Sequence, residues 1–248
     1  KGLDSEIILA TTTSTQDSGL LNVLIPHFEK KANVKVKVVA VGTGQAIQLA
    51  KDGNADVLLV HSRKDEDAFI KDGYGSYAWD VMYNQFLIVG PSKDPASIKD
   101  MKDAAKALKQ IGDKGAKFVS RGDNSGTHKK ELTLWSRAEV DVKNVAGYVS
   151  AGQGMGATLK MADELGAYTL TDEATYLTAK GIDLPVLVKG DPYLFNPYGM
   201  MIVNSSKKQK TGKALIDFFV SGEGQKMIGE FEKSKYGRSI FVPNGRQR

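Results

Sequence analysis

Cysteine is missing from the 248-residue chain. Its absence excludes disulfide bridges, thiolate metal sites and cysteine nucleophiles. A chain without thiols suits an oxidising compartment, but it also suits the cytosol, where many proteins have few cysteines. Cysteine usage therefore leaves the compartment open.

Long apolar runs are missing as well. The longest, at residues 7–10 and 57–60, are far shorter than the roughly 20 apolar residues that a membrane span needs. The sequence also starts without Met and without a basic and then apolar leader. We therefore expect a soluble, mature chain from which a secretion signal has been removed.

Catalytic signatures are scarce. Only His27, His61 and His128 offer an imidazole, and the sequence lacks a Gly-x-Ser-x-Gly elbow, a His-Glu-x-x-His motif and a Gly-x-x-x-x-Gly-Lys-Ser/Thr loop. Acid pairs such as Asp65 and Asp67 stand at predicted helix starts, where carboxylates serve as caps. These observations predict a protein that is not an enzyme.

Basic residues are scattered rather than clustered. The net charge is +5, and most lysine runs are interrupted by acids, which is typical of a solvated surface. Only residues 207–210 and 246–248 are densely basic, and neither segment contains an aromatic residue. We expect no nucleic-acid partner.

The apolar pattern alternates between strand and helix. Short apolar runs predict strands at 6–10, 34–41 and 55–60, with helices at 18–32 and 45–51 between them. This order implies a parallel sheet. The pattern restarts after residue 91 with predicted helices at 98–108, 125–138 and 155–165. The sequence therefore predicts an α/β protein with a second α/β core.

Hydroxyl groups follow the first three predicted strands. Residues 11–15 are an unbroken run of Thr and Ser before a predicted helix, and Thr43 and Ser62 follow the next two strands. The carboxyl ends of parallel strands share one edge of the sheet, where helix N-termini present free N–H groups and a positive dipole end. Helix capping explains each segment alone, but their joint placement favours an anion site.

A polar loop at residues 120–128 is the densest signal. Arg121 offers a fork of donors, Ser125 and Thr127 offer hydroxyls, and Gly126 permits close approach of the backbone. The Arg-Gly-Asp tripeptide at 121–123 leads into a predicted helix, so we do not expect an adhesion ligand. This loop predicts a second set of anion donors.

Glycines recur at residues 152–156 before another predicted helix. Their spacing is close to a dinucleotide fingerprint, and Asp172 follows at about the right distance. The segment 144–150 is short and only partly apolar, however, so no good buried strand is expected to precede the glycines. An anion on the helix N-terminus explains the same pattern, and both interpretations stay open.

The residues favour a ligand that accepts hydrogen bonds and carries no proton. Tungstate, molybdate and sulfate meet this description, whereas phosphate gains from an acceptor and Asp123 is the carboxylate placed to provide one. Enclosing a dianion requires that its oxygens be satisfied, which favours two lobes that close on the ligand.

The motifs together resemble the periplasmic tungstate-binding proteins of ABC uptake systems, which have the type II periplasmic binding protein fold. The resemblance runs through residues 11–21, 41–46, 54–63, 120–127 and 152–156. It implies a two-lobed α/β protein in which each lobe is a mainly parallel sheet flanked by helices and the ligand occupies the interlobe cleft. Related binders of molybdate, phosphate and sulfate share this fold.

The resemblance also implies the details of the binding protein. Lobe 1 is expected to comprise residues 1–88 and 198–248 and lobe 2 residues 89–197, with crossover strands near 85–90 and 196–203. The implied ligand is tungstate or molybdate, without a cofactor or a directly bound metal. The implied partner is a membrane permease, and the chain is expected to be a monomer that is periplasmic or anchored at the cell surface. The implied anion-binding residues are Thr12, Thr13, Ser14, Thr43, Ser62, Arg121, Ser125, Gly126, Thr127, Gly156 and Thr158.

Overall fold

The computed structural model describes residues 2–248, which divide into two compact units. Unit 1 contains the chain up to Tyr83 and Asn196–Arg248, and unit 2 contains Asn84–Phe195. The chain crosses between the units within β4 (Gly75–Val89) and again within β9 (Phe195–Val203). The predicted lobe boundaries, after residues 88 and 197, lie in these same two strands.

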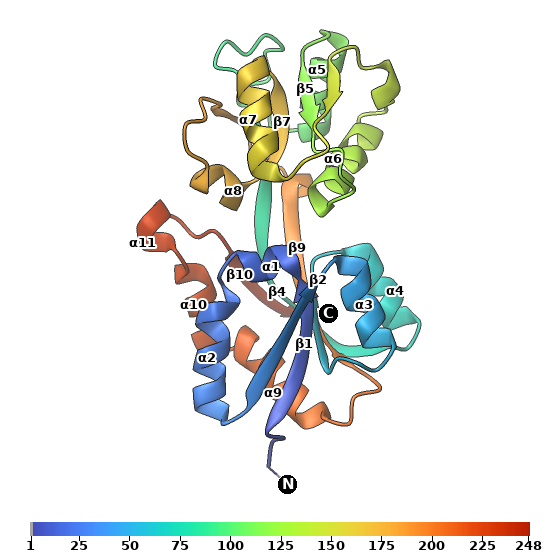
Figure 1. Cartoon of the computed structure of the whole chain (residues 1–248), viewed down its shortest axis with the longest axis vertical. Helices are drawn as coiled ribbons and strands as arrows, with labels where there is room; N and C mark the ends of the chain where they lie inside the picture. The colour runs from blue at the N-terminus through green and yellow to red at the C-terminus, as the bar shows by residue number, and fades with distance from the viewer. Residues whose placement is uncertain (1) are drawn as a thin grey trace. The chain divides into compact units, whose positions relative to one another are not determined.

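Unit 1 is built on a parallel three-stranded arrangement extended by antiparallel strands (Figure 1). β1 (Glu6–Thr12) pairs in parallel with β2 (Lys35–Val41) and with β3 (Val57–Val60). β9 pairs antiparallel with β3, and β10 (Val242–Gln247) pairs antiparallel with the first part of β4. The helices of this unit are α1 (Thr13–Asp17), α2 (Leu21–Ala32), α3 (Thr43–Lys51), α4 (Arg63–Lys71), α9 (Gln209–Val220), α10 (Gly222–Glu230) and α11 (Lys233–Tyr236).

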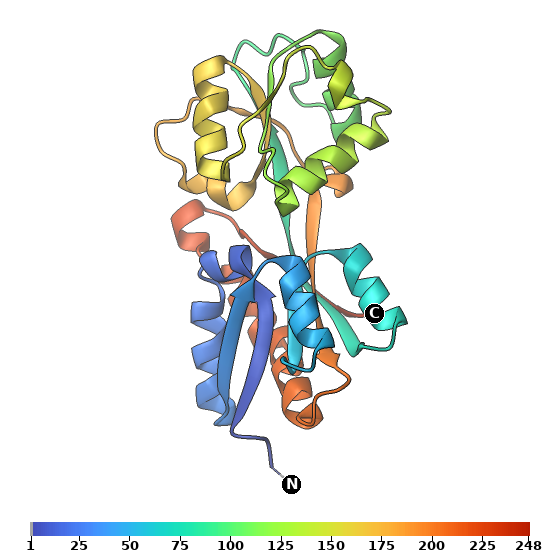
Figure 2. The same cartoon turned by 45° about the vertical axis from the view of Figure 1, so that its right-hand side comes forward.

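Helices cover both faces of the unit 1 sheet. β3 is buried along its whole length, so alternate side chains must enter two different cores. Leu58 and Val60 belong to the cluster that includes Ile47 of α3 and Phe69 of α4. Figures 1 and 2 show α2 on the opposite side of the strands from α3, and α2 contacts α9 and α10.

Unit 2 repeats the design with a shorter sheet. β5 (Phe118–Ser120) pairs in parallel with β6 (Tyr148–Ser150) and β7 (Tyr168–Asp172). The last part of β4 pairs antiparallel with β7 and with β8 (Val186–Val188). The helices are α5 (Ala104–Asp113), α6 (Gly126–Arg137), α7 (Met155–Leu165) and α8 (Glu173–Thr178), and the short 3-10 turns are η1 (Val142–Asn144) and η2 (Pro192–Leu194).

Adjacent residues of β5 serve opposite cores in unit 2. Phe118 packs in the cluster that contains Leu108 of α5 and Trp135 of α6. Val119 packs instead with Leu159 of α7. The sheet is therefore buried on both faces. The loops that follow β5 and β6 leave the sheet at the carboxyl ends of these strands, where a ligand can bind.

The predicted fold class is confirmed, but some predicted elements are wrong. The helix predicted at 98–108 begins only at Ala104, because Ser97 and Asp100 have positive φ angles of 54° and 63° and Asp103 caps the helix by accepting from Lys106 N. α1 and β10 had no prediction.

A short strand precedes the glycine segment, but none of its residues is buried. β6 covers residues 148–150 and pairs with β5, with two half-buried residues and an exposed Ser150. The expectation that no good buried strand leads into Gly152 therefore agrees with the structure.

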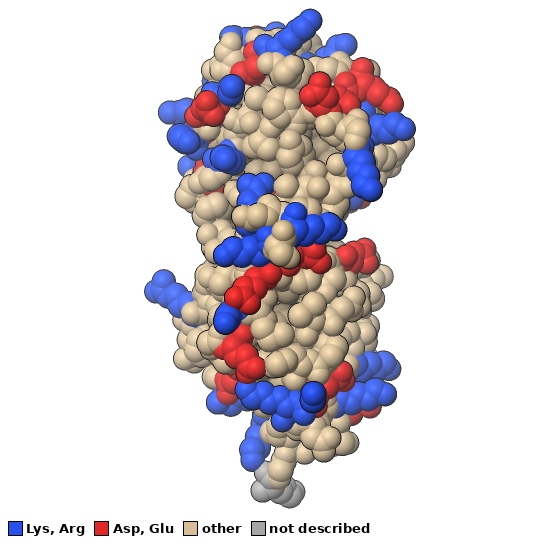
Figure 3. Space-filling view, turned by 90° about the vertical axis from the view of Figure 1, so that its left-hand side faces the viewer, with Lys and Arg blue, Asp and Glu red and all other residues tan. Residues whose placement is uncertain are grey.

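Surface charge is mixed in sign. Figure 3 shows basic and acidic side chains interspersed on the face that it presents. Within residues 2–248, none of the helices combines the length and the apolar character that crossing a membrane would require.

Candidate functional site

The three parallel strands of unit 1 end at one edge. Thr12 at the end of β1 lies opposite Val41 at the end of β2, and Thr11 lies opposite Leu59 of β3. The residues that follow these strands therefore emerge together. They open α1, α3 and α4, so three helix N-termini lie at the edge, as the predicted parallel sheet requires.

Hydroxyl groups cluster where β1 meets α1. Thr12 is only 3% exposed and caps α1, because its Oγ1 accepts from Thr15 N at 3.2 Å. The same oxygen lies 2.6 Å from Thr15 Oγ1 and 3.2 Å from Ser14 Oγ. Thr13 and Ser14 are exposed. The structure thus brings Thr12 and Ser14 together and leaves Thr13 and Ser14 accessible to a ligand.

The start of α3 presents backbone donors. Gly42 is the N-cap residue and provides no side-chain acceptor. The first backbone bond of the helix runs from Ala46 N to Gly42 O at 2.9 Å. The amides of Thr43, Gly44 and Gln45 therefore have no acceptor within the helix. Thr43 adds a half-buried hydroxyl beside them, so this start is suited to an acceptor ligand.

Ser62, the third predicted contributor of unit 1, already uses its hydroxyl within the protein. It precedes α4 and donates to Asp65 Oδ2 at 2.6 Å. Its proton is therefore not available to a ligand unless this bond breaks.

Sequence reasoning left one neighbour of these hydroxyls out of the predicted site. His61 Nε2 lies 3.2 Å from Thr12 Oγ1 and 3.3 Å from Ser14 Oγ. The signal that could have found it is its position, the first residue after β3, next to Ser62. The structure therefore adds an imidazole to the hydroxyl cluster.

In unit 2, β5 and β6 also end together. Ser120 lies opposite Ser150, and the loops that follow lead to α6 and α7. Gly122 has a φ of +59°, and a Cβ atom at this position would lie 1.7 Å from Ser150 Oγ. Only glycine fits there, so the Arg121 loop packs tightly against the end of β6.

Arg121 has a donor to spare in this loop. Its Nη2 donates to Asp123 Oδ2 at 2.6 Å, and the two side chains are 18% and 22% exposed. Its Nε is buried and has no hydrogen-bond partner among residues 2–248. A buried donor without an acceptor costs free energy, so an acceptor ligand at this guanidinium would remove that cost.

Asp123 is an ionised partner. Burial alone would raise the pKa of its carboxyl, but hydrogen bonds from Ser125 and Arg121 hold that pKa below its usual range. The carboxylate thus remains charged at neutral pH and accepts from Ser125 N at 3.2 Å. It orients both Arg121 and the turn into α6.

The start of α6 collects the other predicted donors of this loop. Ser125 caps the helix and accepts from His128 N at 3.2 Å. Gly126 is exposed at the first helical position, and Thr127 is 9% exposed at the second. Their amides precede the first intrahelical bond, from Lys129 N to Ser125 O. The loop and the helix start therefore place predicted donors next to Arg121.

A buried carboxylate anchors α6 to the sheet. Glu131 accepts from Trp135 Nε1 at 2.9 Å and from Tyr148 OH at 2.6 Å. Burial raises the pKa of Glu131, although hydrogen bonds from Ser120 and Tyr148 oppose the rise. These bonds connect α6, β5 and β6, and so fix the orientation of the helix whose N-terminus carries the donors.

The start of α7 offers backbone groups rather than side chains. Gly154 is the N-cap residue without a side-chain bond, and Gly156 is exposed with open space around it. Thr158 is fully buried, and its Oγ1 donates to Gly154 O at 2.9 Å. The predicted Gly156 therefore lies at an accessible helix start, whereas the hydroxyl of Thr158 is used within the helix.

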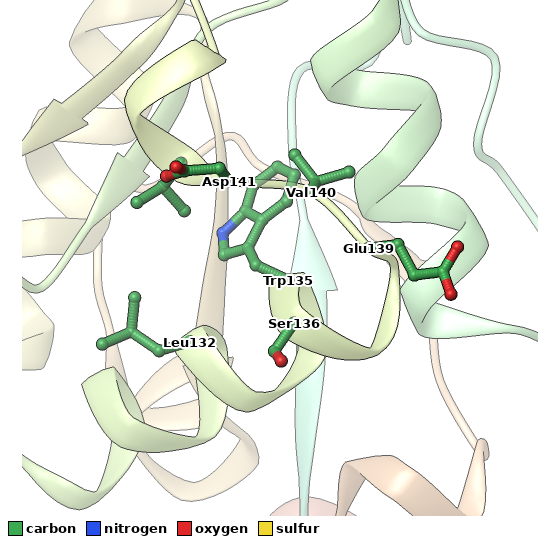
Figure 4. A pocket seen from close by; sticks show the side chains of 7 residues that line it. Leu132, Trp135, Ser136, Glu139, Val140 and Asp141 are labelled. Atoms are coloured by element: carbon green, nitrogen blue, oxygen red, sulfur yellow. The ribbon is translucent and has the colours of Figure 1, made fainter.

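A separate hollow of about 340 Å³ lies on unit 2 between α6 and the segment after it. It is lined by apolar side chains such as Leu132, Trp135 and Val140 together with the carboxylates of Glu139 and Asp141 (Figure 4). None of the predicted anion-binding residues lines it. Its carboxylates would repel an anion, so it is not part of the candidate site.

Each unit therefore presents its own set of hydrogen-bond donors at one sheet edge. Unit 1 contributes hydroxyls and the α3 amides, and unit 2 contributes a guanidinium and the amides of α6 and α7. Both sets favour a ligand rich in acceptor oxygens.

Comparisons with known proteins agree with this chemistry. Residues 2–223 match the PBP superfamily domain. The tungstate-binding protein TupA of Peptoclostridium acidaminophilum is 51% identical over 245 residues, which cover 96% of this chain and 85% of the relative.

Two solved structures extend the likeness to three dimensions. The tungstate-binding protein TupA from Desulfovibrio alaskensis G20 is 40% identical with a TM-score of 0.92, over 98% of this chain and all of that chain. The tungstate ABC transporter structure from Geobacter sulfurreducens is 55% identical with a TM-score of 0.75, over 92% and 99%. The chain belongs to the PBP superfamily and, within it, to the family of tungstate-binding proteins.

Proposed function

We propose that this chain captures the tungstate dianion with high affinity and delivers it to the membrane permease of an ABC importer. The relatives named above, two of them proteins that bind tungstate and one a tungstate ABC transporter, support the choice of ion and of partner. The donor-rich sheet edges of both units support an oxyanion on independent, chemical grounds. The chain would act as a binding protein and not as an enzyme.

The observation that carries an anion ligand is the buried, unpartnered Nε of Arg121. Nη2 of the same guanidinium is paired with Asp123, so the side chain is held in place while its Nε–H remains available to an acceptor. An oxyanion can accept from Nε and a neighbouring nitrogen together, in the two-bond geometry that favours Arg at such sites. Tungstate carries no proton at neutral pH and therefore needs donors alone.

The anion shell is proposed to draw on both units. A dianion removed from water needs each of its oxygens satisfied, and neither unit alone offers both the hydroxyl cluster and the guanidinium. The proposed donors are Thr12, Thr13, Ser14, Thr43, Arg121, Ser125, Gly126, Thr127 and Gly156. Ser62 joins them when its hydroxyl leaves Asp65, whereas Thr158 supports the start of α7 through its bond to Gly154.

We further propose the setting in which the chain works. One solved relative is named as a tungstate ABC transporter, which supports a periplasmic or cell-surface location, and we propose that the chain binds as a monomer. No cofactor is required, and the metal enters only as the oxyanion. Molybdate, which has nearly the same size and charge, is the competing ligand to measure.

A thermal-shift panel tests the function. Tungstate, molybdate, sulfate, phosphate and NAD are compared at equal concentrations. A ligand at 100 times its Kd stabilises the native state by about 2.7 kcal/mol, which corresponds to a rise in Tm of about 5 to 10 °C for a chain of this length. We expect the largest shift with tungstate. No shift with any tetrahedral anion would refute the proposal, and a larger shift with phosphate or NAD would replace it.

Arg121→Ala tests the mechanism. We expect the affinity for tungstate to fall by about 10- to 100-fold with the fold retained, because a hydrogen bond to a charged group contributes about 1.5 to 3 kcal/mol. The matched control is Arg137→Ala, which removes the same charge from the other end of α6, where Arg137 lies over the Tyr193 ring at 3.5 Å. Undiminished affinity in Arg121→Ala would remove Arg121 from the site.

A further inference from the structure

The His61 ring is held between two strands and the hydroxyl cluster. It directly follows β3, and its Nε2 lies 3.2 Å from Thr12 Oγ1 and 3.3 Å from Ser14 Oγ. The ring packs on Tyr198 of β9, with centroids 4.7 Å apart and planes inclined by 38°. A second set of hydrogen bonds joins the ring to the Asn196 side chain and to its own backbone. The imidazole therefore has fixed partners in both sets.

Proton counting shows why the charge of this ring matters to a ligand. A neutral imidazole has one N–H for both sets of partners, and its other nitrogen is an acceptor. If Nε2 accepts, it takes the proton of Thr12 or Ser14 that would otherwise point to an anion. If the ring is protonated, Nε2 donates to the hydroxyl oxygens and no hydroxyl proton is used on the ring. The protonated ring thus increases the number of donors that the cluster can offer.

The surroundings keep the ring neutral without a ligand. Burial lowers the pKa of His61 below its ordinary value, although the bonds to Asn196 and to its own backbone oppose the shift. The groups of β1 and α1 that contact the ring are the hydroxyls of Thr12 and Ser14. The groups of β9 that contact it are the Asn196 amide and the Tyr198 phenol ring.

Two charged groups of α4 are paired elsewhere. Arg63 pairs with Asp80, and Glu66 pairs with Arg248. A dianion held by Ser14 would then be the dominant charge near the imidazole, and an opposite charge at short range favours the protonated form.

We propose that His61 is a positioning residue of the anion site and that its ring takes up a proton when the dianion binds to the hydroxyl of Ser14, next to Thr12. This inference rests on the proposed function and deepens it, because it makes tungstate capture dependent on pH. The affinity should rise as the pH falls, since the bound state holds more protons than the free state.

Calorimetry of tungstate binding tests the proposal. The full chain is titrated with sodium tungstate in buffers of different ionisation enthalpy, at several values between about pH 6.5 and 8.5, and the slope of the observed enthalpy gives the number of protons taken up. For the wild type we expect uptake of a fraction of one proton at pH 7, which vanishes at the alkaline end. His61→Gln, whose amide still donates but does not titrate, should bind tungstate without proton uptake and with an affinity that no longer depends on pH.

A matched control separates His61 from the imidazole of unit 2. His128→Gln removes a ring whose Nδ1 accepts from Asn124 N at 3.0 Å, and it should leave the proton uptake unchanged. Uptake that persists in His61→Gln, or that disappears in His128→Gln instead, would overturn the proposal. If His61→Gln does not fold, the chemical shift of the wild-type His61 ring protons gives the same test. The ring should titrate at a higher pH with tungstate than without, and an unchanged titration contradicts the inference.

The outcomes separate the two proposals. Tungstate binding without proton uptake in the wild type would overturn the role of His61 and leave the proposed function intact. Failure of the wild-type chain to bind tungstate at all would overturn both.

Discussion

Replacing Asp123 by Asn should tighten tungstate binding. Asp123 is ionised and holds Arg121 through Nη2 at 2.6 Å, so its charge lies beside the guanidinium that is proposed to bind the ligand. The Asn side chain keeps the shape and the oxygen that accepts from Ser125 N. The substitution therefore removes a negative charge and preserves the turn, while an amide nitrogen replaces the oxygen that accepts from Arg121 Nη2 and leaves Nη2 to bind the ligand.

The expected gain follows from Coulomb's law. Two negative charges acting on one about 7 Å away repel by about 1.2 kcal/mol in the dielectric of water, and by more in a less polar site. We therefore expect an affinity about 5- to 10-fold higher than in the wild type.

The assay is calorimetric titration with tungstate, alongside Tm measurements that confirm the fold. Asp141→Asn is the control, because it removes the same charge from unit 2. Asp141 also accepts a backbone N–H, from Lys143 at 3.0 Å. An Asp123→Asn variant that folds normally but binds tungstate no more tightly than Asp141→Asn would refute the electrostatic reasoning.

Three further predictions concern stability. Burial raises the pKa of Glu66 from 4.5 to about 7. Its protonated form therefore stabilises the fold below pH 4.5, and this contribution of up to roughly 3 kcal/mol is lost as the pH rises through 7. Urea denaturation from pH 5 to 8 should show that loss in the wild type and not in Glu66→Gln. Gly147→Ala places a Cβ 2.3 Å from Ala116 O and should lower the free energy of unfolding by about 1 to 3 kcal/mol, whereas an unchanged urea midpoint would show that the backbone yields. Trp135→Phe removes the donor 2.9 Å from buried Glu131 and should cost about 1 to 3 kcal/mol; equal stability in denaturant would mean that water replaces the donor.

Periodicity was sufficient for the elements that carry the donors. The strand-helix order predicted the parallel edge of unit 1, and α7 has the predicted bounds of 155–165. The helix predicted at 98–108 was wrong at its start, because Asp103 caps α5 and the helix begins after it. The apolar residues before Asp103 are buried although they are not helical. β10 was missed because its residues, Val242–Gln247, have no alternating apolar pattern and form a strand only through pairing with β4.

The sequence predicted the class of ligand, but it did not predict which donors are already hydrogen-bonded within the protein. Residue types after the strands indicated an anion, and they included Arg121, whose spare Nε only the structure shows. The sequence does not show that Ser62 donates to Asp65 or that Thr158 donates to Gly154. Both are hydroxyls of the expected kind at the expected place, and their availability depends on neighbours three or four residues away.

The two crossings of the chain have a consequence for synthesis. Unit 2 is one continuous segment, Asn84–Phe195, whereas unit 1 needs Asn196–Arg248 to supply β9, α9 and β10. As the chain leaves the ribosome, unit 2 is thus complete before unit 1, although unit 1 contains the N-terminus. Unit 1 cannot complete its sheet around β1 to β3 until β10 has been synthesised. A chain shortened at its C-terminal end would therefore lose the hydroxyl half of the site while keeping a folded guanidinium half.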